Sequence, residues 1–420
     1  MDKLNEKLWA AVEDNRENLV EMTQKLVSYY SPMGSEEKVQ NYVSETLKEL
    51  GLAVDMWEPD MEALEKHPTY YKARSSYLGS PNVVGVLKGS GGGKSLILNG
   101  HIDVVPGEPE KWKHGMDSGD LSEGRIYGRG TADMKGGCAA NIIALKAILD
   151  AGIKLKGDLL IESVVEEETG GAGTLDTLLR GYTADAAIFP EPTDMKIYPV
   201  TMGAVWFRIT VKGLPAHGAL AYMGVSAIEK SVFLLEKIKE FEAKRAIEKQ
   251  HPLYDYMKVP FCINVGKLNA GTWPSIVSSA SVMEGRIGLS PQETMQSAKA
   301  EFEQMIRQVC AEDEWLAGNP PQVEWYGPNW NGGGVEADHP IVATVASAYT
   351  ALKKEAPDIV GAPWPADAIF MTEFGIPAIN FGPGEGSEAH QADESISVDH
   401  LVECTKILAS TIVDWCGCEE

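Results

Sequence analysis

Residues 96–103 read Leu-Ile-Leu-Asn-Gly-His-Ile-Asp, an apolar run that ends at a histidine and an aspartate. A short apolar run of this kind is typical of a strand that is buried on both faces of a sheet. Similar runs occur at residues 83–87, 159–165 and 186–189. Apolar residues recur at helical spacing in residues 39–50, 139–149 and 174–180. This alternation of buried strands with helices predicts an α/β layered domain.

The pattern changes at about residue 205. Branched and aromatic apolar residues occupy every second position of residues 205–211, which predicts a half-solvated strand. A predicted helix at 226–246, a strand at 282–289 and a further long helix follow, so this region has α+β character. We interpret Ser290, Pro291 and Glu293 as the capping box and first turn of that long helix.

Two consecutive prolines, Pro320 and Pro321, follow this region and indicate its exit. A predicted helix at 341–352 and a predicted strand at 378–381 then resume the α/β pattern. At 420 residues the chain is too long for one hydrophobic core. We therefore predict a discontinuous catalytic domain at 1–204 and 319–420, interrupted by an inserted domain at 205–318.

The composition, with 44% apolar and 23% charged residues, is that of an ordinary globular protein. The net charge of −24 would repel phosphate backbones and anionic lipids, so we expect neither nucleic acid nor a membrane as a partner. The chain has no apolar run of about 18 residues and no signal-peptide core, and its six cysteines form no disulfide framework. We therefore expect a cytoplasmic protein. Cys416 and Cys418 could bind a metal, but we favour a frayed C-terminal tail.

Side chains that bind metals stand at the ends of the predicted strands. His101 and Asp103 close the first strand, and their i, i+2 spacing places both on one face. The imidazole can then bind a metal while the carboxylate orients the ring. Asp133 lies in a glycine-rich turn that opens a helix. The carboxyl ends of strands are where an α/β sheet presents its active site.

Acidic residues follow the next two strands in the same way. Glu166, Glu167 and Glu168 end the strand at 159–165, and three adjacent carboxylates repel one another strongly without a cation. Glu191 follows the strand at 186–189. Each signal alone is weak, but their occurrence at successive strand ends predicts a metal centre.

The order of these motifs resembles the M20 metallopeptidase family. The resemblance rests on His-x-Asp at 101–103, Gly-Arg-Gly-x-x-Asp-Met-Lys-Gly-Gly at 128–137, Glu-Glu-x-Gly at 167–170, Glu-Pro-Thr at 191–193, and a late histidine after the Gly-Pro-Gly loop at 382–384. It covers nearly the whole chain. It implies an α/β, zinc-peptidase-like catalytic domain with a mixed sheet flanked by helices, an inserted α+β lid or dimerisation domain, and a homodimer.

The resemblance also implies the ligands of two divalent metal ions per chain. Asp133 would bridge the two ions, His101 and Glu191 would complete one site, and Glu168 and His390 would complete the other. Zn²⁺ suits these mixed nitrogen and oxygen ligands best, and Co²⁺ or Mn²⁺ also fits.

Further roles follow from the same resemblance. Glu167 would be the general base for attack by a metal-bridging water, and Asp103 would keep the ring of His101 oriented. In the lid, His217 would stabilise the oxyanion in the active site of the partner subunit. Asn264 and Arg286 would hold the substrate, although a salt bridge on the strand surface is an alternative role for Arg286.

The function implied is hydrolysis of a linear amide bond in a small N-acyl amino acid, as in the acetylornithine deacetylase-like branch of the family. A metallo-dipeptidase or carboxypeptidase is the main alternative. A non-catalytic metal-binding relative is a further alternative, but such a protein has no need of a free base at Glu167. Residues 89–95 resemble a P-loop, but their spacing is wrong and we interpret them as a hairpin turn.

Overall fold

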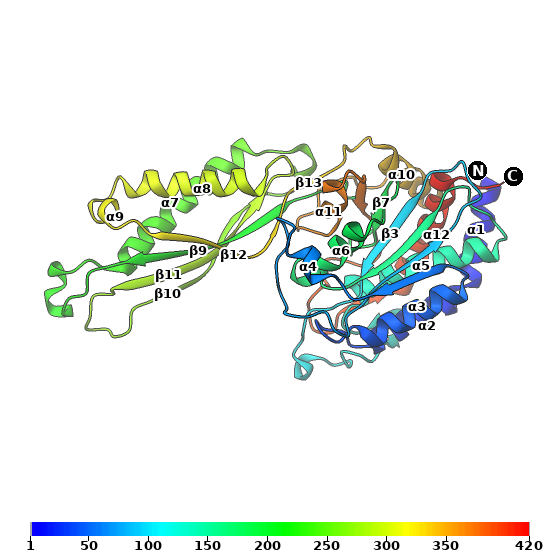
Figure 1. Ribbon diagram of the computed structural model, residues 1–420, viewed down its shortest axis with the longest axis horizontal. Helices are drawn as coiled ribbons and strands as arrows, with labels where there is room; N and C mark the ends of the chain where they lie inside the picture. Colours follow the sequence, from blue (N-terminus) through cyan, green and yellow to red (C-terminus); the bar gives the residue numbers. More distant parts are fainter. Residues whose placement is uncertain (1, 420) are drawn as a thin grey trace. The chain divides into compact units, whose positions relative to one another are not determined.

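The computed structural model describes residues 2–419 and divides the chain into two compact units, labelled by element in Figure 1. The first unit comprises Met1–Val200, Gly334–Ala362 and Ala366–Glu420. The second comprises Thr201–Gly333 and Pro363–Pro365. The inserted unit therefore extends beyond the predicted boundary at residue 318. Its last strand, β12 (Gln322–Trp330), follows the two prolines and pairs with β9 (Gly203–Lys212), so these prolines lead into a strand of the inserted sheet.

A six-stranded mixed sheet forms the centre of the first unit. Its four parallel strands are β6, β3, β7 and β14, while β2 runs antiparallel to β6, and β1 antiparallel to β2. Every residue of β3 and β6 is buried, as the apolar runs predict. In spatial order the strands are β1 (Ala53–Trp57), β2 (Asn82–Leu87), β6 (Leu159–Val164), β3 (Leu96–His101), β7 (Ala187–Phe189) and β14 (Ala378–Asn380).

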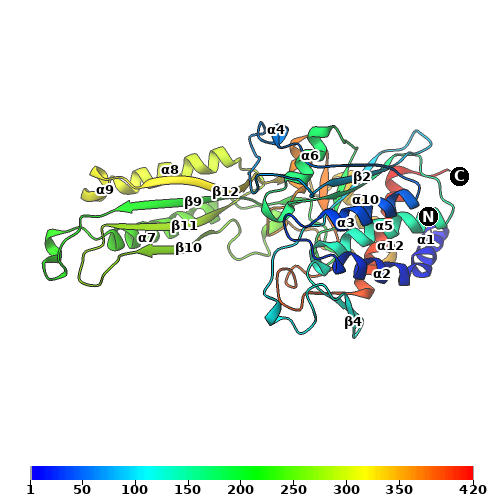
Figure 2. The same cartoon turned by 60° about the horizontal axis from the view of Figure 1, so that its bottom comes forward.

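Helices cover both faces of this sheet (Figure 2). Alternate residues of β6 show this, because Ile161 belongs to the core beneath α5 and α12, whereas Glu162 contacts Thr177 of α6. Helix α5 is apolar on almost every side and almost wholly buried, which explains its central position. The helices of this unit are α1 (Asp2–Asp14), α2 (Arg16–Ser28), α3 (Glu37–Glu49), α4 (Met61–Leu64), α5 (Gly136–Asp150), α6 (Ala172–Arg180), α10 (Pro340–Lys353), α11 (Ala368–Glu373) and α12 (Val398–Cys416).

The second unit has a four-stranded antiparallel sheet and its own core. Strand β9 buries every second side chain, and Phe207 packs against Phe302 of α8. The predicted α/β fold with an α+β insertion is therefore confirmed. The strands lie in the order β10 (Ile263–Ala270), β11 (Ala280–Leu289), β9 and β12, with helices α7 (Ala227–Glu248), α8 (Met295–Cys310) and α9 (Glu314–Gly318). Smaller strands elsewhere are β4 (Asp120–Ser122), β5 (Arg125–Tyr127), β8 (Val200–Thr201), β13 (Gly333–Gly334) and β15 (Ser395–Ser397).

The start of α8 differs from the prediction. Thr294 is its N-cap, and its side chain accepts a hydrogen bond from the backbone of Ser297, so the predicted capping box at Ser290, Pro291 and Glu293 is wrong. Glu293 forms a buried ion pair with Arg245 of α7, at 2.9 Å, and its Oε2 also accepts a hydrogen bond from the backbone N–H of Ser290, ahead of the helix. The buried guanidinium attracts the carboxylate that the sequence pattern assigns to the cap.

Two loop predictions are also wrong. Residues 89–95 do not form a hairpin turn, because β6 lies between β2 and β3, the two strands that this loop connects. Backbone N–H groups of the loop instead donate hydrogen bonds to the carbonyls of residues 155 and 156. The C-terminal tail is not frayed, since the carbonyls of Cys416 and Gly417 accept hydrogen bonds from residues 157 and 156. Burial raises the pKa of the Cys416 thiol to about 12, which disfavours a thiolate ligand. Within residues 2–419, no helix is both long and apolar enough to cross a membrane.

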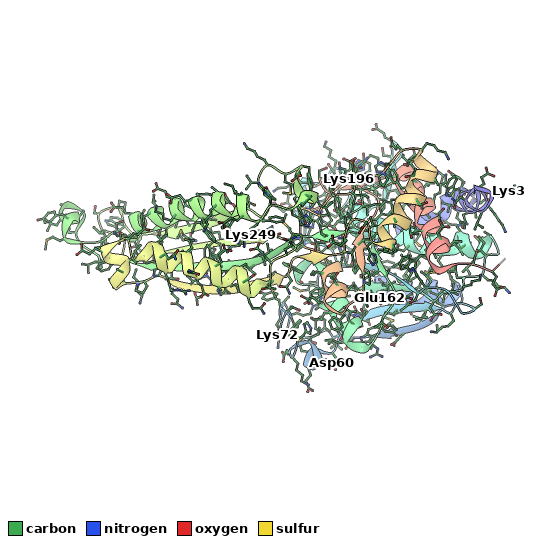
Figure 3. The ribbon with its side chains drawn as sticks, turned by 90° about the horizontal axis from the view of Figure 1, so that it is seen from above. Lys3, Asp60, Lys72, Glu162, Lys196 and Lys249 are labelled. Atoms are coloured by element: carbon green, nitrogen blue, oxygen red, sulfur yellow. The ribbon has the colours of Figure 1, made fainter. Side chains whose placement is uncertain are left out.

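A buried carboxyl group, that of Glu162 on β6, lies beneath α6 (labelled in Figure 3). Asn99 donates a hydrogen bond to its Oε2 at 2.8 Å. Burial raises the pKa of Glu162 to about 7, and the hydrogen bonds from Asn99 and Thr177 only partly oppose this.

The Glu162 pKa makes stability depend on pH. The folded protein binds more protons than the unfolded chain between the unfolded pKa of about 4.3 and the folded pKa, so the free energy of unfolding falls as pH rises through this window. We expect Glu162→Gln to remove this dependence. In denaturant titrations, the free energy of unfolding of the variant relative to wild type should be about 1–3 kcal/mol higher at about pH 8.5 than at about pH 5. Surface variant Glu110→Gln is the control, and an equal difference at both pH values would contradict the prediction.

Candidate metal centre

Three parallel strands bring the predicted ligands to one edge of the sheet. His101 is the last residue of β3, the Glu166–Glu168 turn follows β6, and Glu191 follows β7. Since β6, β3 and β7 are parallel neighbours, their carboxyl ends meet at this edge. His390 arrives on the chain after β14, which is the next strand in the same direction.

Asp133 reaches the same edge on an irregular turn before α5. The turn (Thr131–Lys135) is preceded by Gly130, whose φ of 88° lies in the left-handed region that favours glycine. The Asp133–Met134 peptide bond is cis. Lys135 is fully buried and donates hydrogen bonds to the carbonyls of residues 26 and 29, at the end of α2. This lysine therefore anchors the turn to the helix layer.

The carboxylate of Asp133 lies between two histidines. Its Oδ1 is 3.0 Å from Nε2 of His101, and its Oδ2 is 3.3 Å from Nε2 of His390. The same Nε2 of His390 is 3.1 Å from Oε1 of Glu168. Ligand atoms of His101, Asp133 and Glu168 all lie within 4.8 Å of one another. One oxygen of this carboxylate thus faces each of the two imidazoles.

The ring of His101 is held by the backbone of Asp103. Its Nδ1 lies 2.9 Å from the carbonyl oxygen of Asp103, whereas the nearer carboxylate oxygen is 3.7 Å away. This carboxylate instead accepts hydrogen bonds from the backbone N–H groups of Glu167 and Glu168, each at 3.2 Å. Asp103 thus orients the imidazole through its carbonyl and the acidic turn through its side chain.

The two histidines have strongly raised pKa values. Burial lowers the pKa of His101, but the hydrogen bond with Asp133 and the charge of Asp103 outweigh it, so this pKa lies well above its usual value. Hydrogen bonds with Asp133 and Glu168 raise the pKa of His390 to about 10. The surrounding carboxylates therefore favour the protonated, positively charged form of both imidazoles.

The pKa values of the carboxyl groups of Glu167 and Glu191 are also raised, because their charged forms are destabilised. Burial, and then the charge of Asp367, raises the pKa of Glu167 well above its usual value. Burial and the charge of Asp133 do the same for Glu191. The clustered carboxylates destabilise one another's charged forms, and a cation at this edge would relieve the repulsion.

The residues fit divalent metal ions. Oε1 of Glu191 is buried and has no hydrogen-bond partner within residues 2–419, so a ligand oxygen is available. Imidazole nitrogens and carboxylate oxygens are the donors that catalytic zinc sites use, and cobalt or manganese accepts the same set. The five side chains are His101, Asp133, Glu168, Glu191 and His390.

Glu394 supports this centre and was not found from the sequence. Its buried Oε1 accepts hydrogen bonds from the backbone N–H groups of Gly130, Ala132 and Asp133, at 2.9–3.1 Å. Its Oε2 accepts one from Arg129 at 2.6 Å. Arg129 in turn donates to the carbonyl of His390 at 3.3 Å. The only available signal was an acidic residue four positions after the late histidine.

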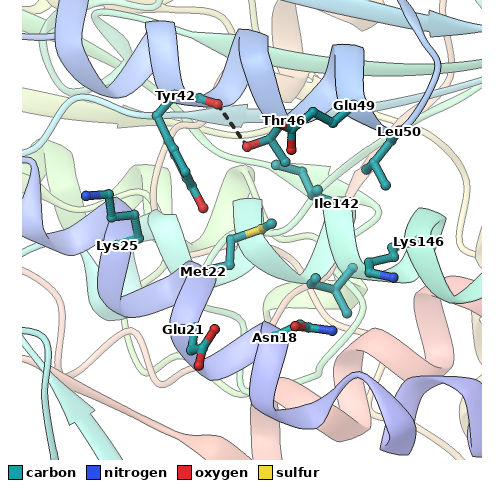
Figure 4. A pocket seen from close by; sticks show the side chains of 11 residues that line it. Asn18, Glu21, Met22, Lys25, Tyr42, Thr46, Glu49, Leu50, Ile142 and Lys146 are labelled. Atoms are coloured by element: carbon teal, nitrogen blue, oxygen red, sulfur yellow. Dashed lines mark hydrogen bonds between the residues drawn. The ribbon is translucent and has the colours of Figure 1, made fainter.

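Two cavities differ in their relation to this centre. One of about 430 Å³ is lined by His390, Trp112 and Arg129, whose guanidinium carbon is 5.1 Å from the centroid of the indole ring. Another of about 510 Å³ lies among α2, α3 and α5, where Lys25 and Lys146 stand at its rim (Figure 4). Of these two cavities, only the first is lined by a predicted ligand, His390.

The predicted lid residues belong to the second unit. His217 is exposed, and its Nδ1 accepts a hydrogen bond from the backbone of Ala219 at 3.1 Å. Asn264 and Arg286 are register partners on β10 and β11. Arg286 forms no ion pair with any described residue, and its Nε is buried without a hydrogen-bond partner among them. The alternative role of Arg286 as a surface salt bridge is therefore wrong.

Comparison with known proteins places this site in a family. Residues 97–414 match the family described as peptidase family M20/M25/M40. The chain belongs to the M20 family. It is 32% identical to N-formyl-4-amino-5-aminomethyl-2-methylpyrimidine deformylase of Bacillus subtilis, over 99% of both chains. It is also 31% identical to an acetylornithine deacetylase of Myxococcus xanthus, over 80% of this chain and 84% of that one.

Solved structures confirm the M20 fold. Aminopeptidase PepT of Bacillus cereus superposes with a TM-score of 0.72 at 22% identity, over 95% of this chain and 98% of that one. The Bacillus subtilis YXEP protein, described as a dinuclear metal-binding peptidase of family M20, gives a TM-score of 0.62 at 17% identity, over 96% and 99% of the two chains. Family membership makes this chain a metal-dependent hydrolase of a linear amide C–N bond.

Glu394 offers a test of the support around the metal centre. We expect Glu394→Gln to weaken divalent-metal binding by about 10- to 100-fold, because an amide cannot accept from both the turn and Arg129. The dissociation constant is measured by competition with a chelator. The matched control is Glu388→Gln, since Glu388 lies 3.9 Å from Arg125 and is partly exposed. Wild-type affinity in Glu394→Gln would show that Glu394 does not support the ligands.

Proposed function

We propose that this protein is a two-metal amidohydrolase that removes a short acyl group, foremost a formyl group, from a small N-acylated amine. The observation that carries the proposal is the Asp133 carboxylate, which turns one oxygen to His101 and the other to His390, on the same sheet edge as the half-buried Glu167. Two relatives named as deformylases, 32% and 33% identical over nearly the full chain, support the acyl group. The peptidase structures are under 25% identical and support the fold alone.

His101, Asp133, Glu168, Glu191 and His390 would hold the two ions. When bound, the ions supply a Lewis acid for the scissile carbonyl and lower the pKa of water. Asp133 contacts a histidine of each site, so it fixes the separation of the two ligand sets. These nitrogen and oxygen ligands favour Zn²⁺, and Co²⁺ or Mn²⁺ are the alternatives.

Glu167 is the group that moves the proton. It follows β6 on the same turn as the ligand Glu168, and the side chain of Asp103 fixes its backbone N–H. Burial and the charge of Asp367 raise the pKa of Glu167, so its carboxylate accepts a proton from water readily. The same carboxyl group can then give this proton to the amine that leaves.

A substrate with a carboxylate is the second candidate, and Arg286 favours it. Its guanidinium is half-buried, its Nε has no hydrogen-bond partner among the described residues, and its Nη2 contacts only the sulfur of Met202, so it has donors available for a carboxylate. The neighbouring Asn264 is exposed on the paired strand and offers an amide to the same ligand. An N-acyl amino acid or a dipeptide satisfies this arrangement.

A substrate panel separates the candidates. Metal content by mass spectrometry is measured together with hydrolysis of N-formyl aminomethyl heteroaromatics, N-formyl and N-acetyl amino acids, and dipeptides. Preferred cleavage of formyl amines without a carboxylate supports the first proposal. Preferred cleavage of N-acetyl amino acids or dipeptides, with a rise in KM in Arg286→Met, supports the second. A protein that binds metal but cleaves no member of the panel would overturn both.

Two substitutions distinguish the proposed base, Glu167, from the proposed metal ligand, Glu168. We expect Glu167→Ala to lower kcat by at least about 100-fold while two metal ions remain bound, because this carboxylate is not among the proposed ligands. Glu168→Ala should lose metal, since its carboxylate contacts His390. Turnover on the best substrate and metal content are measured for both variants. Normal turnover by Glu167→Ala would remove it from the mechanism.

We further propose that the protein forms a homodimer through the second unit. Strand β10 is an edge strand of its sheet, and most of its residues are exposed. Exposed apolar side chains lie on the same strand and on α7, with Leu268, Ile228 and Val232 each more than 40% exposed. Unpaired edges and apolar patches of this kind favour pairing with a second copy.

The proposed role of His217 in the partner's site predicts complementation. His217→Ala and Glu167→Ala subunits should each be inactive alone. When the two variants are co-expressed, random pairing makes about half of the dimers heterodimers, and each heterodimer has one complete site out of two. The co-expressed protein should therefore recover about a quarter of wild-type activity. A mixture that stays inactive while forming heterodimers would place His217 outside the partner's reaction.

A further inference from the structure

A buried ionic cluster lies outside the residues that the family motifs identify. Arg74 stands in the segment between α4 and β2. Its Nη2 donates to Oε1 of Glu36 at 2.7 Å, its Nη1 donates to Oγ of Ser80 at 2.6 Å, and its Nε forms an ion pair with Glu166. One guanidinium thus binds two carboxylates, of which one belongs to the acidic turn of the metal centre.

The cluster is buried. The side chain of Arg74 is 8% exposed, and those of Glu36 and Glu166 are fully buried. Hydroxyl groups satisfy further carboxylate oxygens, since Ser80 donates to Glu36 at 2.8 Å and Tyr77 donates to Glu166 at 3.0 Å. Buried ion pairs hold their geometry strongly, because removal of one partner leaves a buried charge without compensation.

Glu166 transmits this geometry to the acidic turn. Its φ of 67° lies in the left-handed region, which is unfavourable for a residue with a side chain. The next two residues are the proposed base Glu167 and the proposed ligand Glu168. Asp103 holds the N–H groups of these two residues, while Arg74 and Tyr77 hold the carboxylate of Glu166. The turn is therefore fixed from both ends.

The N-terminal part of the chain supplies this clamp. Glu36, Arg74, Tyr77 and Ser80 all precede residue 97, where the match to the family begins. Neither the strand-end pattern nor the family motifs single them out. The N-terminal segment thus supplies side chains that reach the acidic turn of the candidate metal centre.

We propose that Arg74 is a positioning residue, which acts through Glu166 to fix the places of Glu167 and Glu168 at the metal centre. The proposal rests on the assignment of Glu167 and Glu168 in the proposed function. A misplacement of about 1 Å at a catalytic group can cost about 100-fold in rate, so the clamp has a measurable effect on turnover.

The test uses the full-length protein loaded with Co²⁺ and three variants. Arg74→Met removes the clamp, Arg74→Lys keeps the charge without the branched contacts, and Arg180→Met is the matched control. Arg180 is a partly exposed arginine of the same unit that pairs with Asp55 and stacks on Trp57. For each variant kcat, KM, melting temperature and the visible Co²⁺ absorption spectrum are measured.

We expect Arg74→Met to lower kcat by about 10- to 100-fold with little change in KM, and to shift the Co²⁺ spectrum. Arg74→Lys should recover part of both, and Arg180→Met should resemble wild type. A lower melting temperature with unchanged kcat and spectrum in Arg74→Met would overturn the proposal and leave Arg74 a purely structural residue.

Two further arms keep the test decisive. If Arg74→Met does not fold, Tyr77→Phe removes only the hydroxyl bond to Glu166, and it should still shift the spectrum and lower kcat by a smaller factor. Unchanged values in that variant overturn the proposal. If wild type cleaves no substrate of the panel, the proposed function fails, but the spectrum alone still decides the positioning role.

Discussion

The interaction on which the site depends is that of the Asp133 carboxylate with the buried imidazole of His101 and the partly exposed imidazole of His390, at a crowded sheet edge. Parallel strands deliver His101, Glu168 and Glu191 to this edge because their carboxyl ends coincide. Such a concentration of acidic groups is unfavourable in a buried place unless cations or protons balance it. The raised pKa values of Glu167 and Glu191 result from burial and from this uncompensated negative charge, which two divalent ions would neutralise.

The surrounding residues show how the fold tolerates that charge. Three buried carboxylates next to the ligands are held by polar groups. Asp103 accepts from two backbone N–H groups, Glu394 accepts from three and from Arg129, and Glu166 forms an ion pair with Arg74 and accepts from the hydroxyl of Tyr77. Hydrogen bonds of this kind stabilise a charged carboxylate and also fix its position. Stability and ligand geometry therefore have the same physical origin at this edge.

The two units divide the work. The first contains the metal centre and a sheet with helices on both faces, whereas the second has its own core around Phe207 and Phe302. The second unit has an exposed edge strand, the exposed His217 and the half-buried Arg286, which forms no ion pair with any described residue. The residues proposed for catalysis thus lie in the first unit, and those proposed for recognition and dimerisation lie in the second.

The sequence by itself determined the fold class, the buried strands and the ends at which the ligands stand, because apolar periodicity and strand-end residues are local signals. The sequence also indicated the family, through motifs at fixed spacing. Only the tertiary structure decided the partners of buried charges. Glu293 pairs with Arg245 instead of capping a helix, β12 joins the inserted sheet, and Arg74 and Glu394 reach the site from distant segments. These contacts depend on which segments meet in space, and no local pattern encodes that.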